Sequence, residues 1–456
     1  MFSKFYSNKY VWTLLALLFF ISAMFFSTQK SKAVPSFARQ TGLACNSCHT
    51  VFPQLNSFGR NFKLNGYTFT TADVIELKSD DTLSNTSFLK LLKMSPISAM
   101  LESSFTHLGK PADGTSNDNV AFPQQLSLFL AGAIAPKLGL FMQITYDDQS
   151  GAFGWDNTEL RFADNTTIGN SDLVYGLTLN NNPTVQDLWH TTSAWGYPYA
   201  SSAVAPAPGA ATLIDGGLAG QSLGLGAFAL WNDLLYAELS VYHSAFQGGS
   251  HPYDSTVSGV IQGVAPYWRL ALQYQFSNQY ISVGTIGLMA NTIPTGISGT
   301  TNKFTDFGAD IQYEMGIGSG SDALSVYGSY IHEKQELDAT FASEASQNKT
   351  NELNQFKINA SYYFLQRLNL TLGYFTTSGS ADNILYPSGP VSGNYNGKPD
   401  SDGLIAEFGY LPWLNTRFSL QYVMYNKFNG ASTNYDGAGR DAAHNNTFYL
   451  LTWFMF

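Results

Sequence analysis

The sequence contains 456 residues and has a formal net charge of −10, with 12% charged residues, 15% aromatic residues and 41 glycines. The negative balance argues against nucleic acid as a partner, because nucleic-acid-binding chains present basic surfaces. The charged fraction is about half of that in ordinary soluble domains, and beyond the N-terminal region no stretch is long and apolar enough for a membrane helix. With so many aromatic residues and glycines, this composition favours a transmembrane β-barrel.

The N-terminal residues have the pattern of a secretory signal peptide. Lys4 and Lys9 precede an almost entirely apolar run over 11–26, and the Ser-Lys-Ala sequence at 31–33 offers the small residues that a signal peptidase recognises. The alternative is an uncleaved membrane helix, but the run is shorter than the roughly 20 apolar residues of a span. We therefore expect cleavage after Ala33, which removes four lysines and no acidic residue and changes the net charge from −10 to −14.

The only two cysteines of the chain, Cys45 and Cys48, are followed directly by His49. This Cys-x-x-Cys-His pattern is typical of haem c attachment, because two thiols on one side of a helical turn can form thioethers while the histidine ligates the iron. A redox-active Cys-x-x-Cys does not require the histidine, and a zinc site requires more thiols or nearby histidines. We therefore predict one covalently bound haem c, held by Cys45 and Cys48 and ligated by His49.

The residues after the motif predict a short amphipathic helix that packs on haem. Apolar residues recur there at helical spacing, with a proline before and a glycine after them: Leu55, Phe58, Phe62, Pro53 and Gly66. Arg60 and Lys63 fall on the opposite side, where either can pair with a haem propionate. The haem segment 34–93 is near the lower size limit for a self-sufficient core, so haem should supply apolar surface. It either plugs the barrel or hangs below it in the periplasm.

From Pro96 onward, apolar and polar residues alternate in segments of strand length. In the clearest segment, 268–276, Leu270 and Leu272 share one face while Arg269 and Gln273 share the other. The segments 356–364 and 368–374 alternate in the same way. A period of two with one apolar face indicates a half-buried strand, and in a barrel the apolar face meets lipid while the polar face lines the lumen.

The connections between these segments alternate in length along the chain. Short polar turns lie at 136–139, 232–233, 277–279, 318–322 and 366–367, whereas long connections span 109–120, 181–217, 247–263 and 379–401. Outer-membrane barrels have this asymmetry, with short periplasmic turns and long extracellular loops. The chain also ends in an amphipathic strand with Phe456 as the last residue, which resembles the signal for bacterial barrel assembly. We predict an all-β fold: an antiparallel barrel of about sixteen strands over 94–456, in the outer membrane of a Gram-negative bacterium.

A distal iron ligand has to come from the linker or the barrel, because no histidine or methionine lies between His49 and Met94. Met100 is the apolar exception on the polar, lumenal face of the first expected strand. His107 should point outward near the rim. Methionines in barrels usually only pack, so Met100 is our hypothesis, with Met94, His107 or no protein ligand as alternatives. Methionine ligation would raise the reduction potential relative to two histidines.

The remaining histidines show no metal-ligand spacing, and ordinary surface or lumen positions are expected for them: His190, His243, His251, His332 and His444. Aspartates recur in three long connections, where they either concentrate a divalent cation or keep the outer loops solvated: Asp113, Asp118, Asp382, Asp400, Asp402, Asp436 and Asp441. No Ser-His-Asp arrangement, paired carboxylates or phosphate-binding glycine loop is present, so we assign no catalytic residue.

The residues around the motif belong to a longer pattern. It reads Pro-Ser-Phe-Ala-Arg-Gln-Thr-Gly-Leu-Ala-Cys over 35–45 and continues through Cys48 and His49 to Asn-Gly-Tyr at 65–67. This pattern resembles the fused monohaem cytochrome–porins of the outer membrane, best known from iron-oxidising bacteria, and the order of signal peptide, single motif and barrel is similar too. The resemblance implies that Cys45, Cys48 and His49 carry haem, that extracellular Fe(II) is oxidised and that electrons pass to a periplasmic cytochrome.

The leading functional hypothesis is an outer-membrane electron-transfer protein, which is an Fe(II)-oxidising oxidoreductase in the sense that its haem accepts electrons from Fe(II). Two alternatives stay open: a diffusion porin with a structural or sensory haem, and outward electron transfer to an extracellular acceptor. The expected partners are membrane lipid, extracellular Fe(II) and a periplasmic electron carrier. The direction of electron flow depends on the haem potential and the carrier, which no sequence motif specifies.

Overall fold

The computed structural model of the chain describes residues 36–43, 45–50, 52–68, 74–77, 89–92, 95–147, 151–196, 198, 200–245, 260–296, 299–318, 322–413 and 415–456. The predicted signal peptide and two residues considered above, Met94 and His251, lie outside the described residues. Among the residues that are described, no helix is both long and apolar enough to cross a membrane.

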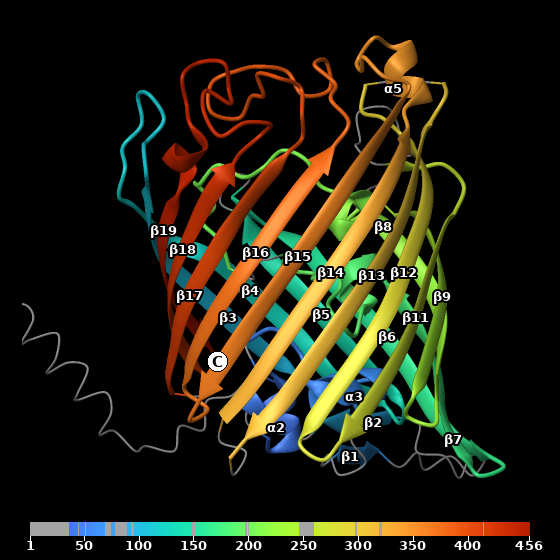
Figure 1. Ribbon diagram of the computed structural model, residues 1–456. Coiled ribbons are helices and arrows are strands. Elements are labelled where there is room, and N and C mark those ends of the chain that lie inside the picture. Colours follow the sequence, from blue (N-terminus) through green and yellow to red (C-terminus); the bar gives the residue numbers. More distant parts are fainter. Residues whose placement is uncertain are drawn as a thin grey trace, which may run out of the picture.

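The described strands form one closed antiparallel barrel (Figure 1). The hydrogen-bonded order runs from β11 to β19, continues from β3 to β9, and is closed by the pairing of β9 with β11. A two-residue strand, β10 (Val260–Ile261), adds a short pairing to β12, so that sixteen of the 17 strands of this sheet form the ring. This architecture confirms the predicted all-β barrel.

The sixteen strands of the ring have the following bounds. The first seven are β3 (Ile97–Leu108), β4 (Asn119–Ala135), β5 (Leu138–Asp147), β6 (Ala152–Ile168), β7 (Ser171–Asn180), β8 (Ser222–Trp231) and β9 (Leu235–Ser244). The other nine are β11 (Ala265–Phe276), β12 (Gln279–Ile293), β13 (Asn302–Ile317), β14 (Asp322–Glu336), β15 (Thr350–Phe364), β16 (Leu368–Gly379), β17 (Ser401–Trp413), β18 (Thr416–Lys427) and β19 (Thr447–Met455).

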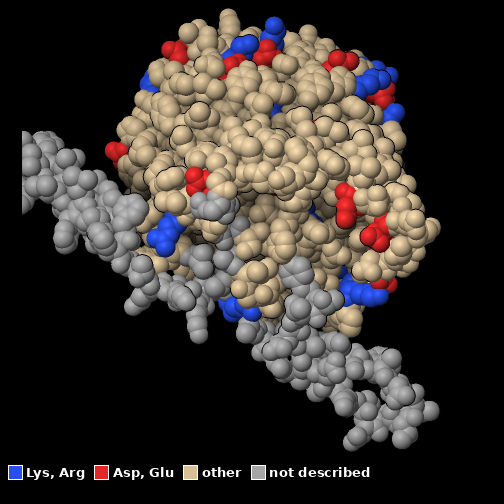
Figure 2. Space-filling model, turned by 60° about the horizontal axis from the view of Figure 1, so that its bottom comes forward, with Lys and Arg blue, Asp and Glu red and all other residues tan. Residues whose placement is uncertain are grey.

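The outer surface of the barrel is apolar, as the alternation predicts. On β11, Leu270, Leu272 and Tyr274 are exposed, whereas Arg269 and Ala271 are buried inside. Figure 2 shows the same arrangement for the whole visible face: Lys, Arg, Asp and Glu gather towards the two ends, and the wall between them carries almost no charge. A closed barrel with an uncharged outer band satisfies every strand hydrogen bond and presents apolar side chains to lipid. The chain is therefore an outer-membrane barrel.

The two ends of the barrel differ (Figure 1). One end has tight turns, such as the two residues between β4 and β5, and the C-terminal strand also finishes there. The other end carries the long connections, which contain α5 (Asp338–Ala342) and the 3₁₀ turn η3 (Ala442–Asn445). Short periplasmic turns and long extracellular loops are the pattern of outer-membrane barrels, so the short-turn end is the periplasmic one.

The N-terminal segment lies inside the barrel near the short-turn end (Figure 1). It contains α2 (Ser36–Thr41), the 3₁₀ turn η1 (Cys45–Ser47) and α3 (Ser57–Leu64), and is followed by the small hairpin of β1 (Val74–Leu77) and β2 (Leu89–Leu92). The helix predicted after the motif is thus confirmed as α3, whose N-terminus is capped by the Asn56 side chain, which accepts a hydrogen bond from the Gly59 N–H at 2.9 Å.

The connection between β7 and β8 also folds into the lumen. It carries α4 (Pro183–Gln186) and the distorted helical turn η2 (Leu213–Gly217). Its residues reach strands on the far side of the barrel, because Thr212 donates a hydrogen bond to Gln355 on β15 at 3.2 Å and the Ala200 carbonyl accepts one from Gln421 on β18 at 3.1 Å. We call residues 181–221 the inner loop. Together with the N-terminal segment, it occupies part of the lumen of the barrel.

Candidate functional site

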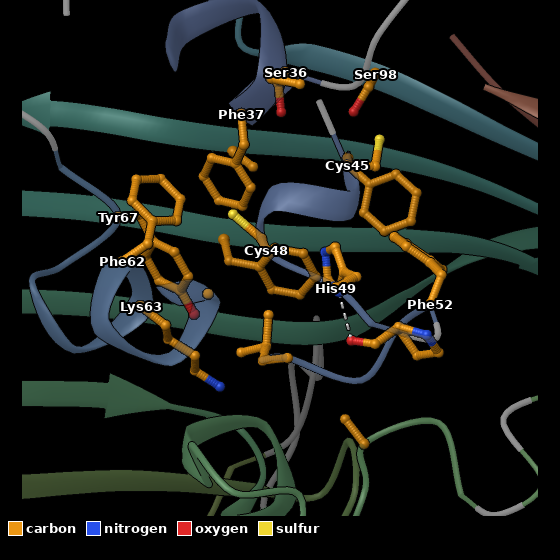
Figure 3. A pocket seen from close by; sticks show the side chains of 18 of the residues that line it. Ser36, Phe37, Cys45, Cys48, His49, Phe52, Phe62, Lys63, Tyr67 and Ser98 are labelled. Carbon is orange, nitrogen blue, oxygen red and sulfur yellow. Dashed lines mark hydrogen bonds between the residues drawn. The ribbon is translucent and has the colours of Figure 1, made fainter. Parts of the chain in front are cut away.

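The two cysteines and the histidine of the motif come together at one cavity inside the barrel (Figure 3). The backbone makes a helical turn here, since the N–H groups of Cys48 and His49 both donate to the Cys45 carbonyl, at 3.1 and 3.0 Å. This turn brings all three side chains to the wall of the same cavity. The turn is compatible with the haem attachment that the motif predicts, which stays a prediction.

The orientation of His49 is fixed by a backbone carbonyl. Its ring Nδ1 lies 2.9 Å from the carbonyl oxygen of Pro53, so Nδ1 carries the proton in this hydrogen bond and Nε2 keeps its lone pair. The ring also packs against Phe52, with 4.6 Å between ring centroids. Burial lowers the pKa of His49 to about 4, so the imidazole is neutral at physiological pH. A neutral ring with a fixed tautomer is the form that ligates a metal.

The cavity wall is mainly apolar and comes from three parts of the chain. The N-terminal segment, the barrel strands and the inner loop contribute, among others, Phe37, Phe52, Phe62, Tyr67, Phe129, Phe141, Val185 and Trp195. Several rings are in mutual contact: Phe37 packs edge-on to Phe62 at 5.1 Å and stacks on Tyr67 at 5.2 Å. Such a wall suits a flat apolar macrocycle, because the hydrophobic shell excludes water from the iron.

The thiols do not resemble a reactive Cys-x-x-Cys pair. Burial raises the pKa of Cys45 to about 11, and burial together with the neighbouring Cys45 raises the pKa of Cys48 to about 11. Redox-active thiols have a lowered pKa, because the thiolate is the nucleophile. The surroundings therefore argue against thioredoxin-like exchange.

The two basic residues of α3 face different surroundings. Arg60 turns to the barrel wall, where its guanidinium lies 2.7 Å from Glu314 on β13 and stacks over the Tyr280 ring at 4.2 Å. Lys63 lines the cavity, with its ammonium 3.8 Å from Glu159 and donating to the Val185 carbonyl. Arg60 therefore anchors the segment to the barrel, and of the two predicted propionate partners only Lys63 is at the cavity.

The predicted distal ligands lie elsewhere. Met100 is on the lumenal face of β3, as strand parity predicts, and is fully buried, but it packs in a cluster with Phe129, Tyr449, Leu451 and Trp453 and is not among the cavity-lining residues. His107 points outward and is exposed, with its Nδ1 2.5 Å from Asp118. The structure thus does not bring either residue to the motif.

One histidine that sequence reasoning treated as ordinary does reach the cavity. His190, from the inner loop, lines the same cavity as His49 although 141 positions separate the two in the sequence. No motif marks it, since it is an isolated histidine in a long connection. Its position at the cavity results from the inward folding of that connection, which no sequence pattern indicates.

The aspartates of the outer loops serve mainly to fold those loops. Asp382 is buried and accepts hydrogen bonds from the backbone N–H groups of Gln347, Asn348 and Leu385, at 2.9 to 3.0 Å. Asp436 likewise accepts from backbone N–H groups, among them that of Val391 at 3.1 Å. Within the described ranges, no three His, Cys, Asp or Glu side chains gather as ligands for a free metal ion.

Comparisons with known proteins give distant structural similarity alone. No protein-family model and no curated protein matches the chain in sequence. Among solved structures, an anion-selective porin from Comamonas acidovorans is similar at a TM-score of 0.47 and 12% identity, covering 79% of this chain and 98% of the porin. Salmonella typhi OmpF, in complex with daunomycin, gives 0.44 and 13%, covering 79% and 97%. A loop-deletion mutant of Vibrio cholerae OmpT gives 0.42 and 13%, covering 79% and 98%.

Proposed function

We propose that this protein is an outer-membrane electron-transfer cytochrome with one covalently bound haem c in the lumen of its barrel. The observation that carries the proposal is the convergence of Cys45, Cys48 and His49 on one mainly apolar cavity, which the N-terminal segment, barrel strands and inner loop line together. A haem bound there supplies one-electron chemistry at its iron.

The residues of the cavity have distinct roles in this proposal. Cys45 and Cys48 attach the macrocycle through their sulfurs, and His49 ligates the iron through Nε2. The Pro53 carbonyl holds the His49 ring in that orientation through the 2.9 Å hydrogen bond. The aromatic wall would keep water away from a haem bound there.

The place of the cavity supports transfer across the membrane. One haem is a poor conductor across an apolar band about 25 Å tall, but a haem within the lumen lies closer to the outer side than one below the barrel. The N-terminal segment lies towards the short-turn end, so the exit step leads to a periplasmic carrier (Figure 1). The family resemblance makes extracellular Fe(II) the proposed electron donor.

The proposal is tested by mixing purified ferric protein with Fe(II) in a stopped-flow instrument. We expect a pyridine haemochrome spectrum with both vinyl groups saturated, and reduction of the haem by Fe(II). Cys45→Ser should give the spectrum of a haem with one thioether. A protein without covalent haem, or a haem that stays oxidised over minutes, would contradict the proposal.

A diffusion porin is the second candidate, and the sixteen-stranded barrel itself favours it. It requires an open lumen, whereas the N-terminal segment and inner loop occupy the lumen of this barrel. A large steady conductance in planar bilayers, with no redox response, would select the porin. Outward electron flow uses the same residues, and the measured haem potential decides between the two directions.

A further inference from the structure

His190 belongs to a part of the inner loop that is held on both sides. The carboxylate of Asp187 accepts hydrogen bonds from the N–H groups of Trp189, at 3.0 Å, and Thr192, at 3.1 Å. Trp189 also donates from its indole N–H to the Tyr280 hydroxyl at 2.9 Å, and its carbonyl accepts from the Gln312 side chain. Trp189 is thus attached to β12 and β13, and Asp187 ties together the residues on either side of His190.

The backbone of His190 adopts a conformation that needs such support. Its φ is +54°, in the left-handed region that side chains other than glycine rarely occupy. Residues held in this region cluster at functional sites, where the surrounding structure keeps them in place. At this position His190 lines the cavity that His49 also lines, and a smaller one beside Asp310 and Gln312.

The imidazole of His190 has an unsatisfied nitrogen. Its Nδ1 is buried and has no hydrogen-bond partner among the described residues. Buried polar atoms in native structures almost always have a partner, so an orphaned one requires an explanation. The nearest chemical explanation is a group bound in the cavity, since a lone pair on an imidazole is either a hydrogen-bond acceptor or a metal ligand.

We propose that His190 is the distal axial ligand of the haem iron, opposite His49. This inference rests on the proposed function, because it requires haem in the cavity. The inner loop then has a definite purpose: it brings a second imidazole from the β7–β8 connection to a cofactor that is attached to the N-terminal segment. A site with two histidine ligands also has a lower reduction potential than one with histidine and methionine, which favours passing electrons onward.

Met455, on β19, is the competing residue, because its side chain lines the same cavity. A thioether in an apolar wall needs no partner, whereas the buried His190 nitrogen does. Met455 also packs against the cluster around Met100, which gives its side chain an ordinary structural role. The orphaned nitrogen therefore selects His190.

Spectroscopy of the intact ferric protein tests this assignment. We expect electron paramagnetic resonance and near-infrared magnetic circular dichroism of wild-type protein to show low-spin iron with two imidazole ligands. His190→Ala should convert the iron to high spin, and added imidazole should restore the low-spin signal. His190→Met should remain low-spin, show the sulfur–iron charge-transfer band and have a higher potential. Retained heat-modifiable migration verifies that each variant keeps its barrel.

Three matched variants complete the design. His332→Ala removes a histidine of β14 that hydrogen-bonds to Asn354 at 2.9 Å and does not line the cavity, so it should leave the spectrum unchanged. Met100→Leu and Met455→Leu should leave it unchanged too. Low-spin iron that persists in His190→Ala without added imidazole, or is lost in either methionine variant, overturns the assignment while leaving the haem proposal intact. Absence of covalent haem from the wild-type protein overturns both.

Discussion

Backbone hydrogen bonds at Pro53 and Gln54 orient the His49 ring. The hydrogen bond from Nδ1 to Pro53 leaves Nε2 directed to the cavity, and burial keeps the ring neutral. The neighbouring thiols are equally constrained, because they extend from a single helical turn. The residues proposed to attach haem thus lie within one five-residue segment, 45–49, while the barrel strands begin downstream at Ile97.

His49→Ala should therefore abolish the haem spectrum without affecting the barrel. The substitution removes the proximal ligand but no contact on which strand pairing depends. Haem absorbance and heat-modifiable electrophoretic migration, measured on the same sample, check the two parts of this expectation. His243→Ala, on the outward face of β9, is the control. Loss of barrel migration in His49→Ala would show that haem loading is instead a condition for barrel folding.

Three of the candidate haem-binding residues could be selected from the sequence, and a fourth could not. Cys45, Cys48 and His49 form a contiguous motif, so their convergence follows from local geometry alone. The inward position of Met100 followed from strand parity, but whether it reaches the cavity depends on how the N-terminal segment lies in the lumen. His190 could not be selected, because its approach to His49 is created by long-range packing of the inner loop.

At the scale of elements, α3 packs closely against the motif turn. A Cβ added at Gly59 would overlap the carbonyl oxygen of Cys48 and would touch the Leu55 side chain at 3.0 Å. Only a hydrogen at this position lets the helix approach the turn. The contact couples α3 to the two thiols and so to the shape of the cavity.

Gly59→Ala should consequently distort the cavity and weaken the binding of haem in it. Overpacking of this kind costs about 1–3 kcal/mol, and the helix must shift away from the turn to relieve it. We expect a lower haem content or a broadened haem spectrum, with barrel migration retained. Asn61→Ala, on the exposed side of the same helix, should behave as wild type. Identical haem content and spectra in both variants would show that the turn accommodates the shift.

The outer loop 380–400 should have a stability that depends on pH through Asp382. Burial alone would raise the pKa of this carboxyl, but hydrogen bonds from the backbone N–H groups of Leu385, Gln347 and Asn348 outweigh it and hold the pKa below its usual value. A carboxyl with a lowered folded pKa contributes stability above its unfolded pKa of about 3.9, and the contribution is lost as the pH falls through the folded pKa.

Pepsin cleavage of intact protein tests this expectation, since pepsin acts in the acidic range. In the wild type, cleavage within the loop should rise as the pH falls below about 3.9. Asp382→Asn should be cleaved readily even at the highest pH at which pepsin is active. Asp113→Asn alters an exposed loop residue and should have no effect. A loop equally resistant in Asp382→Asn and wild type would contradict the assigned role.

Element prediction from sequence succeeded where periodicity was strong. The alternation over 268–276 identified both the strand and the face that meets lipid, because lipid and lumen impose opposite requirements on alternate residues. The long connection at 181–217 was correctly expected between two strands, but its inward course was not. No local pattern distinguishes a loop that folds into the lumen from one that extends outward.

At the scale of the whole molecule, buried charged side chains hold the N-terminal segment against the barrel wall. Arg60 lies 2.7 Å from Glu314 and also donates to the Leu55 carbonyl at 2.7 Å, while the Ser57 N–H donates to Glu314 at 3.1 Å. On β18, five strands further along the sheet, Arg417 donates to the Phe52 carbonyl at 2.9 Å. The segment therefore acts as a plug, which the sequence left open as one of two arrangements.

With the N-terminal segment in the lumen, we predict a small single-channel conductance for the wild-type protein. The conductance should increase when the contacts between this segment and the barrel are broken. Breaking a buried ion pair costs about 3–5 kcal/mol because one charge stays uncompensated, so Arg60→Met should raise single-channel conductance in planar bilayers. The double variant Arg60→Met with Glu314→Gln leaves no unpaired charge and should conduct less than Arg60→Met alone. A wild-type conductance already as large as that of Arg60→Met would show that the lumen is open.

Electron transfer across the membrane tests the central claim most directly. Haem-loaded protein in liposomes, with a soluble c-type cytochrome and an impermeant Fe(II) chelator enclosed, is mixed with external Fe(II). The account predicts reduction of the enclosed cytochrome in vesicles with wild-type protein and no reduction with His49→Ala. The enclosed chelator traps any Fe(II) that leaks through the barrel, so that leaked Fe(II) cannot reduce the cytochrome directly. An enclosed cytochrome that stays oxidised over minutes beside a fully haem-loaded wild-type protein would contradict it.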